Sequence, residues 1–167
     1  MKYTSAEAAK LLRLLNEEHD SLIVAENLGK SFVASVSEDV ESVRPEYDYK
    51  DTQRRLEEVE GKIRRVKHAI NTFNATHIVP GFDMTIDMML IYIPQLTNRK
   101  NRLAVMAGVL PKARERVGSQ SNIIDYRYAN YDVTVAGEEA RAAAELLAKA
   151  QTALDLINTT ETMEIDL

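Results

Sequence analysis

The stretch LEEVEGKIRRVKHAINTF, residues 56 to 73, carries the strongest structural signal in this sequence. Its apolar side chains recur at alternating steps of three and four residues, the spacing of a helix that packs along one narrow line against a neighbour. That line consists of Leu56, Val59, Ile63, Val66, Ile70 and Phe73. Gly61 lies off the line and costs roughly 1 kcal/mol relative to alanine. We predict a long helix over residues 51–74.

Three further segments, residues 5–29, 85–110 and 137–158, show the same periodicity. The first begins with a capping-box spacing at Thr4. The second contains Pro94, where we expect a kink or a break because proline cannot donate the helical hydrogen bond. The last has an alanine-rich face that would let a neighbouring helix approach closely. Their apolar lines are Ala8, Leu12, Leu15, His19 and Leu22; Ile86, Met89, Ile93, Leu96, Leu103, Ala107 and Leu110, with Lys100 as the single polar member; and Ala140, Ala143, Leu147, Ala150, Leu154 and Ile157.

Two short stretches alternate between apolar and polar residues in the manner of β-strands. They are residues 31–36 and residues 122–135, and the second changes its phase part-way, as a bulge would require. They predict a minor two-stranded antiparallel element, paired either within one chain or between two. Between the first two helices we expect a loop, and after Asn158 a frayed tail.

The predicted fold class is mainly α: an elongated bundle of four long helices with coiled-coil-like seams and the minor two-stranded β element. The 167 residues suit a single helical domain. A helix of about 24 residues spans roughly 36 Å, which is long for a compact domain of this size. Narrow apolar lines on long helices are buried in an elongated bundle or against another copy of the chain, so we expect a homo-oligomer.

Composition excludes several classes of function. The net charge is −5, there is no cysteine, and no run of about 18 apolar residues suggests a membrane span. The opening MKYTSAEAAK lacks the apolar core of a signal peptide, so we expect a cytoplasmic protein without a membrane partner. Motifs of common hydrolases, zinc proteases and phosphate-binding loops are missing. We therefore expect no cofactor and no enzymatic activity, and favour an oligomeric interaction or scaffold protein that could also have a protein partner.

The turn between the second and third predicted helices offers one weak alternative. Most of its polar residues fit a helix end, a Pro80–Gly81 turn and the cap of the next helix. His77 is the exception, because Asp83 and Asp87 are near enough in sequence to orient its ring. These three residues are weak candidates for a metal or acid–base site.

A basic cluster offers a second alternative. Residues Lys62, Arg64, Arg65, Lys67, Arg99, Lys100 and Arg102 lie on the second and third predicted helices. If these helices pack antiparallel, the cluster would form one cationic surface able to bind nucleic acid or another polyanion. The competing interpretation is a solvated face of charged helices, and the overall acidity of the chain argues against binding by the molecule as a whole.

Tyrosine is concentrated in the last predicted strand. Tyr126, Tyr128 and Tyr131 lie within six residues, whereas the whole chain has seven tyrosines. A tyrosine ring with its polar tip suits a partner interface, and it equally suits a strand that covers the ends of helices. These residues are candidate interface residues.

The order of elements resembles a family of small uncharacterised bacterial helical proteins. The matching residues are Ile70, Asn71, Asn74, Thr85, Asp87, Leu90, Gln151, Leu154, Asp155 and Asn158. The resemblance covers most of the chain through short motifs. It implies a helical, coiled-coil-like fold and no established activity.

Overall fold

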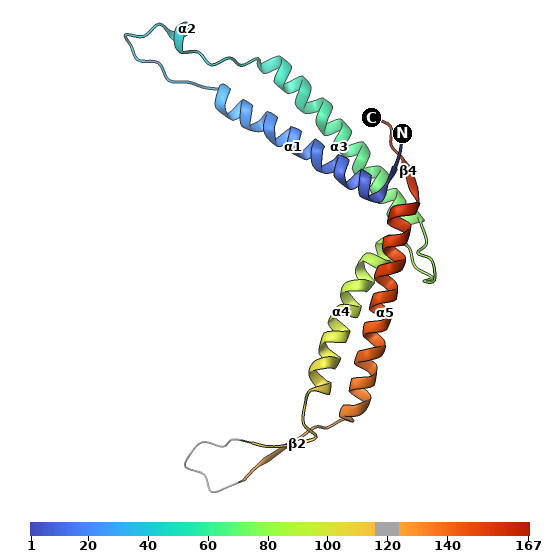
Figure 1. The fold of residues 1–167 in the computed structure, drawn as a ribbon. Helices are drawn as coiled ribbons and strands as arrows, with labels where there is room; N and C mark the ends of the chain where they lie inside the picture. Colours follow the sequence, from blue (N-terminus) through green and yellow to red (C-terminus); the bar gives the residue numbers. More distant parts are fainter. Residues whose placement is uncertain (116–123) are drawn as a thin grey trace. The chain divides into compact units, whose positions relative to one another are not determined.

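The computed structural model describes residues 1–115 and 124–167 of the chain. It is mainly helical, with four long helices and small two-stranded antiparallel sheets, which confirms the predicted fold class (Figure 1). The helices are α1 (Ser5–Gly29), the short α2 (Val40–Val43), α3 (Tyr49–Thr76), α4 (Ile86–Ala107) and α5 (Val133–Thr160). The strands are β1 (Lys2–Thr4), β2 (Lys112–Arg114), β3 (Tyr126–Tyr128) and β4 (Thr162–Glu164).

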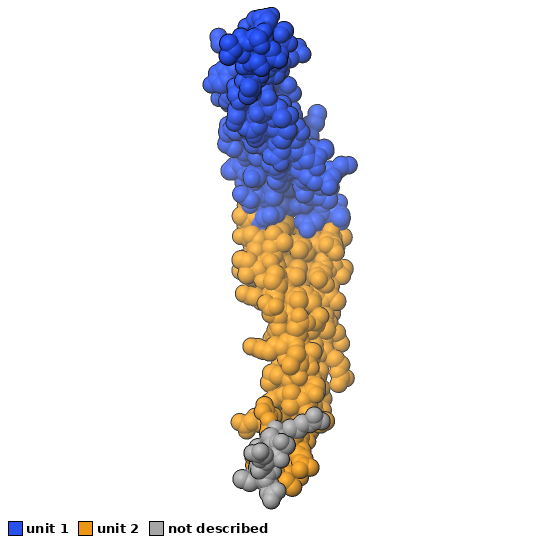
Figure 2. All heavy atoms as spheres, turned by 90° about the vertical axis from the view of Figure 1, so that its left-hand side faces the viewer, with its two compact units in different colours: residues 1–74, 158–167 blue, residues 75–157 orange. Residues whose placement is uncertain are grey.

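The chain divides into two compact units (Figure 2). Unit 1 comprises residues 1–74 and 158–167, and unit 2 comprises residues 75–157. Unit 1 therefore holds α1 and most of α3, together with β1 and β4. Unit 2 holds α4 and most of α5, together with β2 and β3.

Unit 1 is built on the antiparallel pair of α1 and α3 (Figure 1). Leu22 of α1 packs in a buried cluster with Leu56 and Val59 of α3. In an antiparallel pair, seven-residue steps from Leu22 and Val59 place Leu15 opposite Val66 and Ala8 opposite Phe73. All of these residues are buried, with Ala8 and Val66 at 0% exposure. The apolar line of residues 56–73 thus contributes the core of this unit.

The last residue of α1, Gly29, lies where a side chain would have no space. The backbone at the next residue, Lys30, stays right-handed with φ −64°, so the helix does not end in a left-handed turn. A Cβ atom at Gly29 would instead lie 2.8 Å from Cβ of Tyr47, just ahead of α3. The Tyr47 hydroxyl lies 3.4 Å from Oε1 of Glu26 on α1. The missing side chain therefore lets the chain pass close to α1 as it returns toward α3.

Gly29→Ala and Gly61→Ala should change stability in opposite directions. Overpacking against Tyr47 should lower the free energy of unfolding by about 1–3 kcal/mol in Gly29→Ala. At Gly61, in the middle of α3, an added Cβ would meet an Arg64 side-chain nitrogen at 3.7 Å, which is ordinary contact. Gly61→Ala should therefore raise the free energy of unfolding by about 0.4–1 kcal/mol. Urea unfolding of both variants checks this, and equal shifts would contradict it.

The C-terminal tail does not fray, which corrects the expectation from the sequence. Strand β4 pairs antiparallel with β1, with Lys2 opposite Glu164 and Thr4 opposite Thr162. Met163 and Ile165 are buried at 6% and 2% exposure. The two residues alternate with polar ones, so the tail carries a short strand pattern with one apolar face.

The predicted strand at residues 31–36 was wrong. These residues form no strand, and the Val33 side chain is 92% exposed. Alternation alone does not make a strand stable, because a strand needs a paired edge. Strand β1 lies at the start of α1 and pairs with β4, whereas residues 31–36 follow the end of α1.

The predicted strand at residues 122–135 was partly correct. Residues 122 and 123 lie outside the described part of the chain, and β3 pairs antiparallel with β2 instead of with residues 31–36. Helix α5 begins at Val133, earlier than predicted, because Asp132 caps it. The Asp132 carboxylate accepts hydrogen bonds from the backbone N–H of Thr134 at 2.8 Å and of Val135 at 3.3 Å. The apparent change of strand phase was therefore the start of a helix.

Unit 2 is built on the antiparallel pair of α4 and α5 (Figure 1). Helix α4 continues through Pro94 without a break. The buried residues of α5 form what we call the inner line: Ala136, Ala143, Leu147, Ala150, Leu154 and Ile157. A Cβ on Gly137 would lie 3.7 Å from that of Ala107, so the small residues of α5 do bring the helices close. None of the helices in the described residues is long and apolar enough to cross a bilayer.

Candidate interaction surfaces

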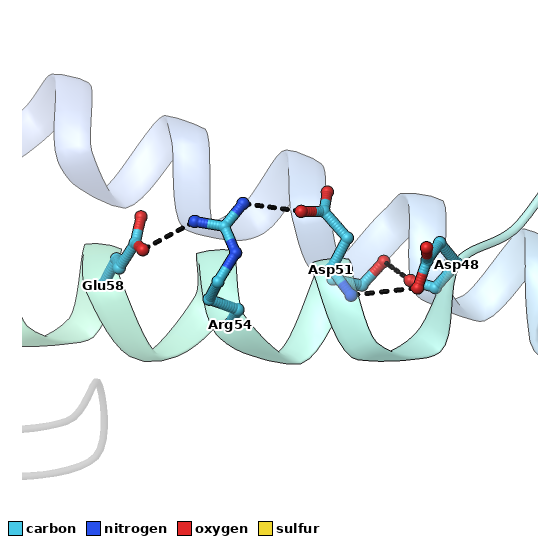
Figure 3. A network of polar contacts seen from close by, with 5 residues as sticks. Asp48, Asp51, Arg54 and Glu58 are labelled. Carbon is cyan, nitrogen blue, oxygen red and sulfur yellow. Dashed lines mark hydrogen bonds and ion pairs between the residues drawn. The ribbon is translucent and has the colours of Figure 1, made fainter.

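The basic residues of α3 lie among carboxylates. Arg54 donates to Asp51 at 2.5 Å and to Glu58 at 2.6 Å, within the network that also includes Asp48 (Figure 3). Arg64 lies 3.8 Å from Glu60. A shallow depression of about 490 Å³ on this helix is lined by Arg54, Glu57, Glu58, Gly61, Lys62, Arg64 and Arg65. The surface of α3 thus combines both signs of charge.

The two halves of the basic cluster fall in different units. Residues Lys62, Arg64, Arg65 and Lys67 are on α3 in unit 1, and Arg99, Lys100 and Arg102 are on α4 in unit 2. Helix α3 packs against α1, and α4 packs against α5. Within its own unit, each half of the cluster thus lies on a helix whose partner is α1 or α5, and one cationic surface formed by both halves stays a prediction. Arg99 lies 3.9 Å from Glu139 of α5.

The tyrosines contact their own unit. Tyr126 and Tyr128 are exposed on β3, and the ammonium of Lys112 lies 4.2 Å and 5.5 Å from their ring centroids. Across the same hairpin Arg127 makes two hydrogen bonds to Glu115, which lower the pKa of that carboxyl.

Tyr131 has a different role from the other two tyrosines. Its hydroxyl donates to the Met106 carbonyl at 2.8 Å. Tyr131 therefore ties the end of α4 to the segment that leads into α5. This contact corresponds to the covering role considered for the tyrosines in the sequence.

The turn around His77 is organised by backbone bonds and one buried side chain. Ile78 and Thr85 form an antiparallel bridge, and Val79, at 0% exposure, anchors the turn. Gly81 has φ +78°, which favours glycine. Thr85 donates its hydroxyl to Asp87. In residues 1–115 and 124–167, no group of three or more histidine, aspartate or glutamate side chains is placed to hold a metal ion.

Helix α5 carries a second apolar line that the sequence analysis did not find. This outer line consists of Val135, Glu139, Ala142, Leu146, Lys149, Ala153 and Leu156, again at alternating steps of four and three. Val135 and Leu156 are 48% and 53% exposed, and Leu146 and Ala153 are half-buried. The spacing of these residues is visible in the sequence, but the charged residues Glu139 and Lys149 interrupt the apolar pattern. In addition, the first residue, Val135, was predicted to belong to a strand.

A groove lies on the outer line near the end of α5. Its volume is about 370 Å³, and it is lined by Pro80, Ala148, Lys149, Thr152, Ala153 and Leu156. Four of these residues, Lys149, Thr152, Ala153 and Leu156, are spaced i, i+3, i+4 and i+7 along the helix. That diamond is the hole into which a side chain of a partner helix fits in a coiled coil.

The fold of this chain is similar to that of a bacterial protein of known structure. The crystal structure of a functionally unknown conserved protein from Corynebacterium diphtheriae matches with a TM-score of 0.58 and 16% sequence identity, over 98% of this chain and 100% of that one. No family model matches the sequence, and no curated protein matches it. The resemblance to uncharacterised bacterial helical proteins is therefore confirmed for the fold, and it brings no activity with it.

Proposed function

We propose that this chain is a helical interaction protein that associates with itself through the outer line of α5. The observation that carries the proposal is the presence of two apolar lines on one helix. Within unit 2, the inner line packs against α4, while the outer line keeps large apolar side chains at the surface. A helix with two such lines is typical of one that packs against two neighbours.

The chemistry of the outer line suits a helix as partner. Its small residues Ala142 and Ala153 permit close approach, and the groove beside Ala153 has a largely apolar lining. A contiguous exposed apolar patch marks an interaction surface, whereas exposed apolar residues that occur singly need no explanation. On the outer line the apolar residues recur at helical spacing, with Glu139 and Lys149 among them. Self-association would support a scaffold role, because a dimer presents two copies of each surface that lies outside the interface.

Light scattering coupled to size exclusion tests this proposal. At tens of micromolar, the protein should elute with at least twice the mass of its 18.8 kDa chain. Val135→Asp should shift it toward the monomer, because an aspartate on the outer line would lose its hydration in the interface. The same variant should keep its helix content, because an acidic residue near the start of a helix is favourable.

Val105→Asp is the matched control. Val105 lies on α4 in the same unit and is 73% exposed, more than Val135. Its replacement should leave the mass unchanged. A strictly monomeric wild-type protein would refute self-association, and equal dissociation of both variants would refute the assignment to α5.

A further inference from the structure

Resting on the proposed function, we infer that the outer lines of two copies pair antiparallel, around a twofold axis that passes beside residue 144. The occupant of the α5 surface is thus a second α5. The inference comes from the order of charges along the line. Glu139 and Lys149 lie at equal distances on either side of Ala144, so an antiparallel copy places Glu139 opposite Lys149. The twofold symmetry produces this charge pair twice.

Two layers of the line pair a larger with a smaller side chain in the same register. Val135 falls opposite Ala153, and Ala142 falls opposite Leu146, whereas Leu156 falls opposite Asp132 at the start of the helix. Antiparallel coiled coils fill their layers with such pairs, because each knob enters a hole on the partner helix. The charges alone define this register, and the sizes of the side chains in these two layers agree with it.

The groove on α5 lies where this register requires a hole. The residue of the second copy that faces Ala153 is Val135, whose side chain is 48% exposed. Val135 of each copy would enter the diamond of Lys149, Thr152, Ala153 and Leu156 on the other. The volume of the groove, about 370 Å³, is larger than an isopropyl group.

Other arrangements of the two helices are less favourable. A parallel pair would bring Glu139 against Glu139 and Lys149 against Lys149, and like charges in an interface are costly. A shift of the antiparallel pair by seven residues in either direction places Glu139 opposite Ala142 or Leu156. Lys149 then lies opposite Asp132 or Leu146, so neither shift pairs Glu139 with Lys149. In the inferred register, Glu145 of the two copies flanks the axis, where its exposed side chain can extend into solvent.

Charge reversal tests the register. Glu139→Lys puts lysine opposite lysine, and Lys149→Glu puts glutamate opposite glutamate, twice in each dimer. Each variant alone should have a dimer dissociation constant at least tenfold higher than the wild type. A 1:1 mixture of the two should associate with wild-type affinity, because every charge pair is then of opposite sign. Sedimentation equilibrium of the wild type, both variants and the mixture measures all four.

The mixture also controls for effects within one chain. Arg99 lies 3.9 Å from Glu139 in the native chain, so the lysine introduced by Glu139→Lys would lie beside a like charge. That repulsion is the same in the mixture as in the single variant, and recovery on mixing therefore reports contacts between copies. Arg141→Glu, an exposed charge reversal off the line, should leave the affinity unchanged.

The possible failures are distinguishable. If the wild type is a monomer, both the proposed function and this inference are overturned. If the wild type associates and the two reversed variants associate equally well, or if mixing restores nothing, self-association stands and the antiparallel register is overturned.

Discussion

Phe73→Ala should lower the free energy of unfolding by about 3–5 kcal/mol, the range for removing a fully buried aromatic ring. Phe73 is 2% exposed in the core of unit 1. The register of α1 and α3 places it opposite Ala8, a residue too small to fill the space left by the ring. The loss should therefore lie toward the upper part of the range. Urea unfolding followed by circular dichroism measures it.

A second substitution tests the register that this expectation assumes. Ala8→Leu alone should destabilise by overpacking, because Ala8 is at 0% exposure. In the Phe73→Ala background the added leucine would occupy the vacated space, so the double variant should be more stable than Phe73→Ala alone. Simple additivity of the two losses would show that Ala8 and Phe73 do not face each other.

Met89→Ala should lower the free energy of unfolding by about 2–5 kcal/mol, whereas Met88→Ala should change it by less than about 0.5 kcal/mol. The two methionines are neighbours on α4, but Met89 is at 0% exposure and Met88 at 52%. The pair removes the same atoms from the same turn of the helix, so burial alone separates them. Similar losses in both variants would mean that the Met88 face is covered in solution.

The variants Phe73→Ala and Met89→Ala together test whether the chain unfolds as one cooperative unit or as two. Phe73 belongs to unit 1 and Met89 to unit 2. If the chain is the single domain predicted from its sequence, both variants should shift the same cooperative transition. Two separated transitions, each sensitive to one variant, would show that the units unfold independently.

The long helices were predictable because their buried lines are periodic. Val59, Val66 and Phe73 repeat every seven residues on α3, and each is buried. In α5 the line from Ala143 to Ile157 was predicted residue by residue. Such patterns arise from helix geometry, which is local, so one sequence suffices to show them.

The strands and the candidate surfaces depended on non-local information. Residues 31–36 alternate as a strand should, yet they form no strand, while residues 162–164, which were expected to fray, pair with residues 2–4. The basic residues around Lys62 and Arg99 were grouped on the assumption that consecutive long helices pair. In the structure the pairing is α1 with α3 and α4 with α5, and no periodicity within a helix encodes that choice. The outer line of α5 is present in the sequence as a periodic pattern. It could be recognised as a separate surface only once the inner line was known to pack against α4.

The pairing of β1 with β4 has a consequence for the order of folding during synthesis. Unit 2 is a continuous stretch of chain inserted between the two parts of unit 1. As the chain leaves the ribosome, α1 and α3 can pair early and unit 2 can form next from neighbouring segments, because local contacts need little loop closure. The edge of β1 must wait until residues 162–164 emerge, with Met163 and Ile165 still missing from the core. Unit 1 is therefore the first to begin folding and the last to finish.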